Sequence, residues 1–277
     1  MLNFEQMSLA LLSFFFMLLG CRHIDSRSGV KIVGGEPTAA SQDKRPLYST
    51  VQLEYIGTSP DNPGGYCTGT VIGPHHIVTA AHCLHAFGPP EIYLASNRQK
   101  LTPTGFTIHP MWGKEPNFAH DIGVISFSQV SDPKENSVGE GIIIPAQIAS
   151  PEKLQVGTEI LLAGFGEMEQ GKSVLNQLYQ VKTKVAQINP TMKIFDIESG
   201  SGKGPCHGDS GGPAYLDENG LLLLVGATSH NVNGKCDSGE GTYTDVTRYL
   251  SWIRCAFAEQ KIAFGNPVES EDCLDPK

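Results

Sequence analysis

The chain has 277 residues, a formal net charge of −9 and charged side chains at only 18% of its positions. No run or stripe of basic side chains occurs among its 20 Lys and Arg residues, which argues against a nucleic-acid partner. With 31 Gly and 18 Pro, the composition is typical of many short strands joined by turns, which a single all-β domain of roughly 200–250 residues can accommodate.

The first 21 residues have the pattern of an export signal. Residues 7–19 are apolar and uncharged, and this run is shorter than the ~20 residues that a membrane-spanning helix needs. The end of the run, Leu18-Leu19-Gly20-Cys21, resembles a bacterial lipobox, in which the cysteine is lipidated, although Glu5 and the bulky Leu19 depart from that pattern. We expect export, with lipidation of Cys21 left open. The protein would be secreted, periplasmic or lipid-anchored at the cell surface, and only such an anchor would bring it to a membrane.

Short strands then follow one another along the chain. Apolar and β-branched runs bounded by turn residues predict strands at residues 48–55, 68–72, 76–80, 91–94, 106–109, 122–127, 159–163, 179–186, 193–197, 213–215, 221–229 and 241–245. Residues 58–65 are expected to be a turn-rich connection. Such a series predicts a β-barrel or a β-sandwich.

One helix is expected, close to the C-terminus. Thr247 is a suitable N-cap for a helix over residues 247–263, in which Leu250 and Ile253 lie near one face. Residues 265–277 would form a loose acidic tail, and no linker divides the chain into two independent domains.

The cysteines support export. Seven are present, and without Cys21 the number is even, which in an exported chain indicates disulfides formed in an oxidising compartment. The spacing alone leaves open how the other six pair: Cys67, Cys83, Cys206, Cys236, Cys255 and Cys273.

The stretch 205–213, Pro-Cys-His-Gly-Asp-Ser-Gly-Gly-Pro, places a hydroxyl between glycines. Ser210 there suits a nucleophile on a tight, exposed turn that a substrate carbonyl can approach closely. A Gly-rich surface turn is the alternative interpretation of this stretch alone. Because a serine hydroxyl is nearly inert at neutral pH, catalysis would require a base and a group that orients the base.

Two other segments supply candidates for those groups. His82 follows a predicted strand and lies among small residues, which would let a base approach the nucleophile closely. Asp121 leads into an apolar run, where a carboxylate is costly to bury unless a hydrogen-bond partner accepts it. His82 is a candidate for that partner.

These segments, their order, the Lys31-Ile32 junction and the terminal helix with Trp252 together resemble the trypsin and chymotrypsin family of serine peptidases over residues 32–259. The resemblance implies two packed six-stranded antiparallel β-barrels with a C-terminal α-helix. It implies a serine endopeptidase, a hydrolase that acts on protein or peptide substrates without a cofactor, and we expect a monomer. A binding protein that retains the fold without useful catalysis and a dedicated esterase are the alternatives.

The resemblance also assigns roles to individual residues. Ser210 corresponds to the nucleophile that forms the acyl-enzyme, His82 to the base that later acts as acid, and Asp121 to the group that holds the imidazole tautomer. The N–H groups of Gly208 and Ser210 correspond to the oxyanion hole, and Ser229 to a hydroxyl that supports the aspartate. The implied disulfides are Cys67–Cys83 and Cys206–Cys236, with Cys255–Cys273 as an addition.

The resemblance implies that Asp209 pairs with the new N-terminus made by cleavage at the Lys31-Ile32 junction. Cleavage there would free the α-amino group of Ile32 to pair with the Asp209 carboxylate, so the intact chain is expected to be a zymogen. The expected organisation is therefore an export signal (1–21), an activation propeptide (22–31), a peptidase domain (32–264) and a tail (265–277).

The residues that match the substrate pocket carry no charge at its floor. Gly204 stands where a trypsin has an aspartate, so we expect a preference for uncharged or apolar side chains over Arg and Lys, and a separate activating protease to cut after Lys31. Gly241 corresponds to another wall of the pocket, while His230 and Asn231 would narrow its entrance. Asp237 and Glu240 lie in a loop of uncertain alignment that could supply charge.

No metal site is expected. The spacing of His75, His76, His207 and His230 does not resemble a zinc motif. Trp112 and Met111 are interpreted as loop packing and not as substrate contacts.

Overall fold

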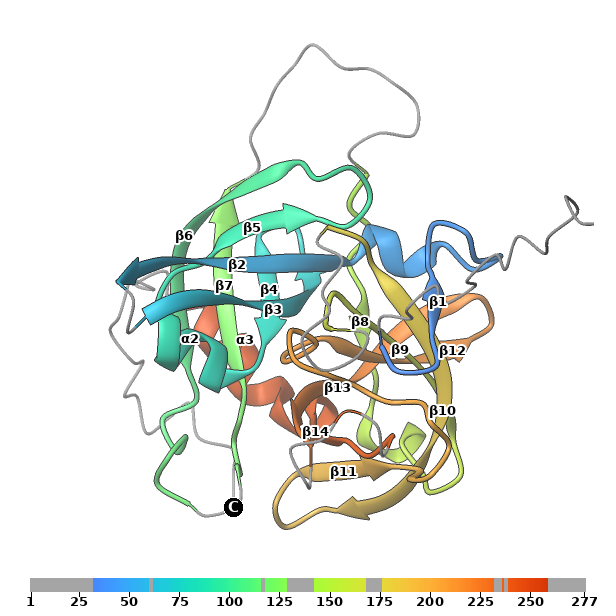
Figure 1. The fold of residues 1–277 in the computed structure, drawn as a ribbon. Coiled ribbons are helices and arrows are strands. Elements are labelled where there is room, and N and C mark those ends of the chain that lie inside the picture. The colour runs from blue at the N-terminus through green and yellow to red at the C-terminus, as the bar shows by residue number, and fades with distance from the viewer. Residues whose placement is uncertain are drawn as a thin grey trace, which may run out of the picture.

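The structure is a computed structural model that describes residues 32–59, 62–115, 118–128, 142–167, 176–231, 236 and 239–258. This part of the chain forms two β-barrels. The first barrel closes in the order β2-β3-β4-β7-β6-β5, with every pairing antiparallel (Figure 1). Its strands are β2 (Thr50–Ser59), β3 (Asn62–Gly73), β4 (His76–Thr79), β5 (Glu91–Leu94), β6 (Lys100–Ile108) and β7 (Gly123–Ser128). Apolar side chains such as Val51, Leu53 and Ile77 fill its interior.

The second barrel closes because β9 pairs with both β10 and β12. Its strands are β9 (Glu159–Gly164), β10 (Tyr179–Asn189), β11 (Ile194–Ile197), β12 (Pro213–Glu218), β13 (Leu221–His230) and β14 (Thr242–Asp245). Two short strands extend this sheet: β1 (Glu36–Pro37) pairs with β10, and β8 (Gln147–Ile148) lies parallel to β13. The expected pair of six-stranded barrels is confirmed, with that one parallel pairing as an addition.

The helices differ from the expectation in two ways. The helix α2 (Ala81–Phe87) was not predicted, since its seven residues are too few to show a helical period. The C-terminal helix α3 (Leu250–Ala258) begins after a 3₁₀ turn, η3 (Val246–Tyr249), so the prediction of Thr247 as its N-cap is wrong. The Thr247 hydroxyl instead donates to the Asp245 carboxylate at 2.5 Å. The predicted end of this helix at residue 263 lies outside the described residues.

The connection predicted at residues 58–65 is largely strand. β2 continues to Ser59 and β3 begins at Asn62, so these two strands form a long hairpin. The register shifts between Ile56 and Ser59, and Gly64 has a φ of 81°. A bulge with a glycine therefore continues the hairpin where the composition indicated a turn. Two further 3₁₀ turns, η1 (Arg45–Tyr48) and η2 (Pro151–Lys153), lie on connections.

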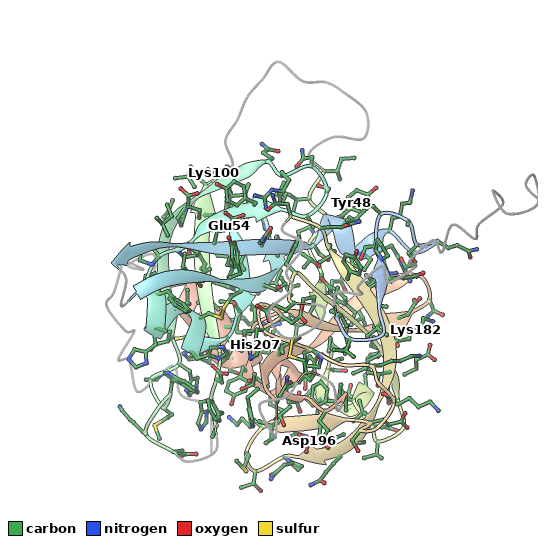
Figure 2. The ribbon with its side chains drawn as sticks, in the orientation of Figure 1. Tyr48, Glu54, Lys100, Lys182, Asp196 and His207 are labelled. Atoms are coloured by element: carbon green, nitrogen blue, oxygen red, sulfur yellow. A yellow bond between two sulfur atoms is a disulfide. The ribbon has the colours of Figure 1, made fainter. Side chains whose placement is uncertain are left out.

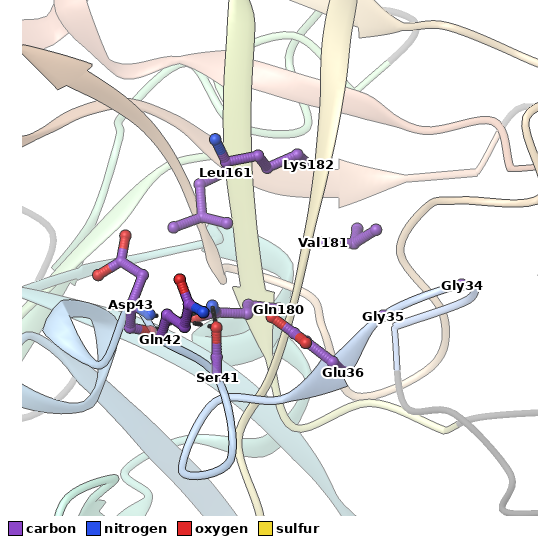
Figure 3. A pocket seen from close by; sticks show the side chains of 10 residues that line it. All are labelled: Gly34, Gly35, Glu36, Ser41, Gln42, Asp43, Leu161, Gln180, Val181 and Lys182. Atoms are coloured by element: carbon purple, nitrogen blue, oxygen red, sulfur yellow. Dashed lines mark hydrogen bonds between the residues drawn. The ribbon is translucent and has the colours of Figure 1, made fainter.

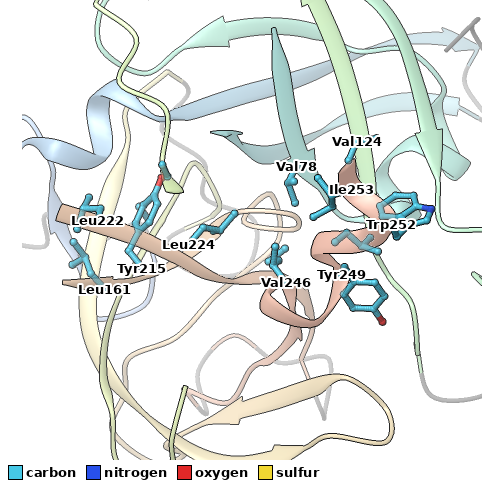
Figure 4. Packing of buried hydrophobic residues seen from close by; sticks show 14 of the residues in the cluster. Val78, Val124, Leu161, Tyr215, Leu222, Leu224, Val246, Tyr249, Trp252 and Ile253 are labelled. Carbon is cyan, nitrogen blue, oxygen red and sulfur yellow. The ribbon is translucent and has the colours of Figure 1, made fainter. Parts of the chain in front are cut away.

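A shared apolar cluster joins the barrels to the C-terminal helix. Figure 4 shows side chains from both barrels and from α3 in this cluster, including Val78, Val124, Leu161, Leu224, Trp252 and Ile253. The buried Tyr215 hydroxyl adds a polar link, since it lies 2.7 Å from Ser49 Oγ and 3.1 Å from Thr50 Oγ1 across the seam. Charged side chains such as Lys100 and Lys182 lie on the outside (Figure 2). Within the part of the chain that is described, no helix has the length and apolarity to cross a membrane.

His109 is buried beside α3 and is 2% exposed. Its ring stacks on His120 at a centroid distance of 4.5 Å and meets the edge of Tyr249 at 5.3 Å. Its Nδ1 accepts from the backbone N–H of Met111, whereas its Nε2 is buried without a partner in the described structure. Desolvation, followed by the charges of His120 and Lys193, lowers the pKa of His109 from 6.5 to about 3.

We therefore expect His109 to make unfolding easier in acid. Between pH 6.5 and about 3 the unfolded chain binds a proton at His109 that the folded chain does not. The free energy of unfolding should fall as pH falls through this window, by up to about 1.4 kcal/mol per pH unit from this residue. Urea unfolding from pH 7 to pH 4 should show a shallower slope in His109→Phe, which keeps the stacked ring and cannot titrate. Equal slopes in the two proteins would contradict this assignment.

Candidate active site

His82 and Asp121 form a doubly hydrogen-bonded pair. His82 lies on α2 directly after β4, and Asp121 lies just before the neighbouring strand β7. His82 Nδ1 is 2.8 Å from Asp121 Oδ2, and the backbone N–H of His82 donates to Oδ1 at 2.9 Å. A proton on Nδ1 facing the carboxylate leaves Nε2 as an acceptor, which is the tautomer that a general base requires.

The carboxylate of Asp121 is fully buried and draws further support from the second barrel. Ser229 Oγ on β13 donates to Oδ2 at 2.6 Å, and Thr244 Oγ1 on β14 donates to the Asp121 backbone carbonyl at 2.8 Å. A buried carboxylate is costly unless such donors satisfy its oxygens. Ser229 was expected here from the family pattern, whereas Thr244 was not, because a threonine in a strand gives no sequence signal of its own.

Ser210 lies on a turn pressed against the first barrel. Its carbonyl accepts from the Thr68 N–H at 2.8 Å and lies 3.8 Å from Cys83 Sγ, in the residue after His82. The following Gly211 has a φ of 76°, and a Cβ there would lie 2.0 Å from Thr79 Oγ1. The Ser210 hydroxyl makes no hydrogen bond to His82 or to any other described residue. Nucleophile–base contacts of this kind are often long in free enzymes and shorten when substrate binds.

Thr68 braces the turn that carries the candidate oxyanion hole. Its Oγ1 donates to the Gly208 carbonyl at 2.9 Å and accepts from the Phe165 N–H at 3.2 Å. Within the described structure, the N–H groups of Gly208 and Ser210 donate to no protein acceptor, so both are available to an incoming oxygen. The sequence did not reveal Thr68, since its neighbour Cys67 was the only residue of β3 with a recognisable role.

Asp209, directly before Ser210 on this turn, is 1% exposed. Its two oxygens accept from the Gly166 N–H at 2.7 Å and the Cys206 N–H at 2.8 Å. A Cβ at Gly166 would lie 2.4 Å from this carboxylate, so only glycine fits there. Ile32 is also buried in the second barrel, at 1% exposure, but Lys31 lies outside the described residues.

The residues matched to the substrate pocket lie around two chain segments. Val33 pairs with Gly204 through two backbone hydrogen bonds, at 2.9 and 3.1 Å. Asn231 Nδ2 donates to the Pro205 carbonyl at 3.1 Å, and Gly241 packs on the Pro205 ring. Asp237 lies outside the described residues, and Glu240 is half-buried.

An aromatic group lies beside His82. The His230 ring stacks on Phe118 at 4.5 Å, Phe118 is 6.0 Å from Trp112, and Trp112 is 6.5 Å from His82 between ring centroids. Burial lowers the pKa of His230, which favours a neutral ring in this stack. Trp112 also donates from Nε1 to His85 Nδ1 at 3.3 Å, which ties its loop to α2 beside the candidate base.

Two disulfides brace these loops. Cys67–Cys83 ties β3 to α2, and Cys206–Cys236 ties the Ser210 loop to the segment after β13, as the family pattern implied. Cys255 is disulfide-bonded, while its expected partner Cys273, like Cys21, lies outside the described residues. The two Cys/His groupings with metal-like spacing in the described structure are formed by these bonded cysteines, which have no free thiolate to offer.

A cavity of about 430 Å³ lies elsewhere, between β1, β9 and β10. Figure 3 shows its lining, which includes Gly34, Gly35, Leu161 and Gln180 and none of the candidate catalytic residues. Gln180 Nε2 donates into this wall to Ser41 Oγ at 2.7 Å. The cavity is therefore separate from the site around His82.

A family model described as Trypsin matches residues 32–253, which include every candidate catalytic residue. The chain belongs to the trypsin family. It is a serine endopeptidase, and the resemblance noted in the sequence is confirmed.

Individual relatives agree with that assignment. The peptidase is 28% identical over 212 residues to Trypsin Blo t 3 of Blomia tropicalis, covering 68% of this chain and 76% of that one. It is 28% identical over 208 residues to Brachyurin of Leptuca pugilator, covering 68% and 86%. The solved structure of HL collagenase superposes with a TM-score of 0.64 at 23% identity, covering 83% of this chain and all but 1% of the other, which supports the fold.

Thr68 gives a direct test of how the site is held together. Thr68→Val keeps the shape of the side chain but leaves the Gly208 carbonyl and the Phe165 N–H without their partner. We expect the free energy of unfolding to fall by about 1–3 kcal/mol and kcat/KM to fall at least about tenfold. Thr68→Ser retains the hydroxyl and should remain close to the parent in both measurements. If valine and serine behave alike, the hydroxyl does not organise the turn.

Proposed function

We propose that this peptidase hydrolyses peptide bonds through an acyl-enzyme on Ser210, with His82 and Asp121 as its catalytic partners. The observation that supports this most strongly is the His82–Asp121–Ser229 network, in which Asp121 holds the imidazole by Nδ1. Ser210 would attack the substrate carbonyl while His82 Nε2 takes its proton and later returns it to the leaving amine. The N–H groups of Gly208 and Ser210 would hold the oxyanion, a contribution worth about 2.7–4 kcal/mol per donor.

The proposal includes activation by cleavage after Lys31. The α-amino group freed on Ile32 would pair with Asp209, whose carboxylate is already buried and held by two backbone N–H groups. The burial of Ile32 and the pairing of Val33 with Gly204 support this role. A peptidase without an acid at Gly204 would cut poorly after its own Lys31, so a separate trypsin-like protease would activate it.

Export and substrate preference complete the proposal. The disulfides support an oxidising, extracellular compartment, and residues 1–21 would supply the export signal, with secretion and a lipid anchor on Cys21 as the two alternatives. The absence of a charge at Gly204 supports a preference for an uncharged residue over Arg or Lys at P1, the residue whose carbonyl is attacked. We expect the enzyme to act as a monomer without a metal or cofactor.

A fluorophosphonate probe tests the catalytic assignment. It should label the protein after cleavage at Lys31 and not before, because the uncut chain lacks the Ile32–Asp209 pair. Ser210→Ala should remove the labelling, and Asp121→Asn should lower kcat by about 10⁴-fold through the wrong imidazole tautomer. A cut wild-type protein that resists the probe would favour a binding protein without catalysis. Labelling accompanied by ester hydrolysis but no peptide hydrolysis would favour an esterase.

Lys31→Gln tests the coupling of activation to release. If Cys21 is lipidated, the ten residues between anchor and enzyme are cut when the zymogen is activated, so activity should appear in the soluble fraction. Lys31→Gln should remain inactive after treatment with a trypsin-like protease, and with Arg22→Gln and Arg27→Gln added, which leaves no Arg or Lys between Cys21 and Ile32, it should also stay with the membranes. Active enzyme that sediments with membranes would rule out release by this cut.

A further inference from the structure

The two walls of the candidate P1 pocket touch each other at its floor. A Cβ built on Gly204 would lie only 2.9 Å from the carbonyl carbon of Gly239 and 3.0 Å from its oxygen. A side chain at position 204 would therefore point into space that the Gly239 backbone already fills. No side chain, charged or neutral, fits at position 204 beside Gly239.

The middle of the pocket is closed by a proline ring. A Cβ on Gly241 would approach Pro205 Cγ to 2.6 Å and Cδ to 2.7 Å, which is closer than carbon atoms pack in proteins. The Pro205 ring thus lies directly on Gly241 and occupies the space between the two segments that match the pocket walls.

The entrance is crossed by a hydrogen bond. Asn231 Nδ2 donates to the Pro205 carbonyl at 3.1 Å and so ties the end of β13 to the facing wall. A large side chain would have to break this bond and leave the buried Pro205 carbonyl without its partner, a cost that adds to the steric one.

We propose that the peptidase accepts only small P1 residues, namely Gly, Ala or Ser, and that Asn231 is the specificity-determining residue that bars larger ones. This inference rests on the proposed function and narrows it, because leucine and phenylalanine are uncharged and apolar but do not fit. Each methylene that a site cannot accept costs about 10–200-fold in kcat/KM.

A substrate held weakly at P1 needs another side-chain contact, and the aromatic group beside His82 offers one. Phe118 is 47% exposed although it stacks on His230, and Trp112 flanks it. Trp112 lies 6.5 Å from His82, a span that an extended peptide covers in about two residues. An apolar side chain within about three residues of P1 would cover this ledge of Trp112, Phe118 and His230.

The activated full-length enzyme, quantified by fluorophosphonate titration, tests the P1 restriction directly. Chromogenic tetrapeptides that differ only at P1 should give kcat/KM values for Ala or Gly at least tenfold above those for Leu, Phe and Arg. If the probe labels the enzyme but kcat/KM for Leu, Phe or Arg at P1 equals or exceeds that for Ala or Gly, the inference is wrong and the proposed function is retained. Failure to label, or to cleave any peptide, would overturn the proposed function and this inference with it.

Variants locate the barrier. Asn231→Gly removes the bar across the entrance and should lower the Ala-to-Leu ratio of kcat/KM at least tenfold. The same substitution at Asn219, in the β12–β13 turn, should leave that ratio unchanged. An unchanged ratio in Asn231→Gly would show that Asn231 is not the barrier. In the double variant Asn231→Gly/Pro205→Ser, kcat/KM for Phe at P1 should also rise relative to Ala, since the proline ring no longer fills the space beside Gly241.

A substitution of Phe118 tests whether the aromatic ledge contacts substrate. Phe118 has a φ of 56°, so asparagine, which tolerates this conformation, is the replacement least likely to disturb the backbone. Peptides with Ala at P1 and Leu or Phe within three residues of it should have a higher kcat/KM than all-Ala peptides. In Phe118→Asn this ratio of kcat/KM values should fall at least fivefold. Retention of the full advantage would remove the ledge from the recognition of substrate.

Discussion

The buried carboxylate of Asp121 is the point where the two barrels become one site. Its oxygens bind His82 from the first barrel, while Ser229 and Thr244 reach its carboxylate and its backbone carbonyl from the second. A carboxylate this deeply buried is tolerable only when its donors are in place, and the donors come from segments far apart in sequence. The relative position of the barrels is therefore coupled to the orientation of one imidazole ring.

Close backbone contact across the seam serves the same geometry. The Ser210 turn packs directly on β3 and β4, so closely that a Cβ on Gly211 would clash with Thr79. Thr68 donates hydrogen bonds to the Ser210 and Gly208 carbonyls, from its backbone N–H and its hydroxyl respectively. Apolar packing around Tyr215 and Trp252 holds the barrels together without specifying distances at this precision. The hydrogen bonds of Thr68 and Asp121 supply that precision, and removing either would loosen the site before it loosened the fold.

The sequence predicted the barrels well because strand signals are local. Alternating apolar residues bounded by turn residues located β5 to the residue, and most other strands to within a few. It missed α2, whose seven residues make too short a period, and it placed a turn where the hairpin of β2 and β3 continues through a bulge. Both errors arise where tertiary packing decides the local conformation.

The candidate site was predictable only in part, for a related reason. His82, Asp121 and Ser210 stand in distinctive strings, whereas Thr68 and Thr244 act through hydroxyls that any strand threonine carries. Asn231 was noted as an obstruction at the entrance, yet its hydrogen bond to Pro205 depends on how two loops meet, which no spacing encodes.

Gly204 connects the pocket to the activation segment. On one side its backbone pairs with Val33, and on the other it packs against Gly239. Docking of the segment that begins at Ile32 therefore fixes the same residue that closes the pocket floor. The full-length chain already has this pairing and a buried Ile32, so the Lys31 cut would be needed for the Asp209 ion pair and not for the floor. The closed shape of the pocket would then precede activation, whereas the catalytic activity would depend on the cut.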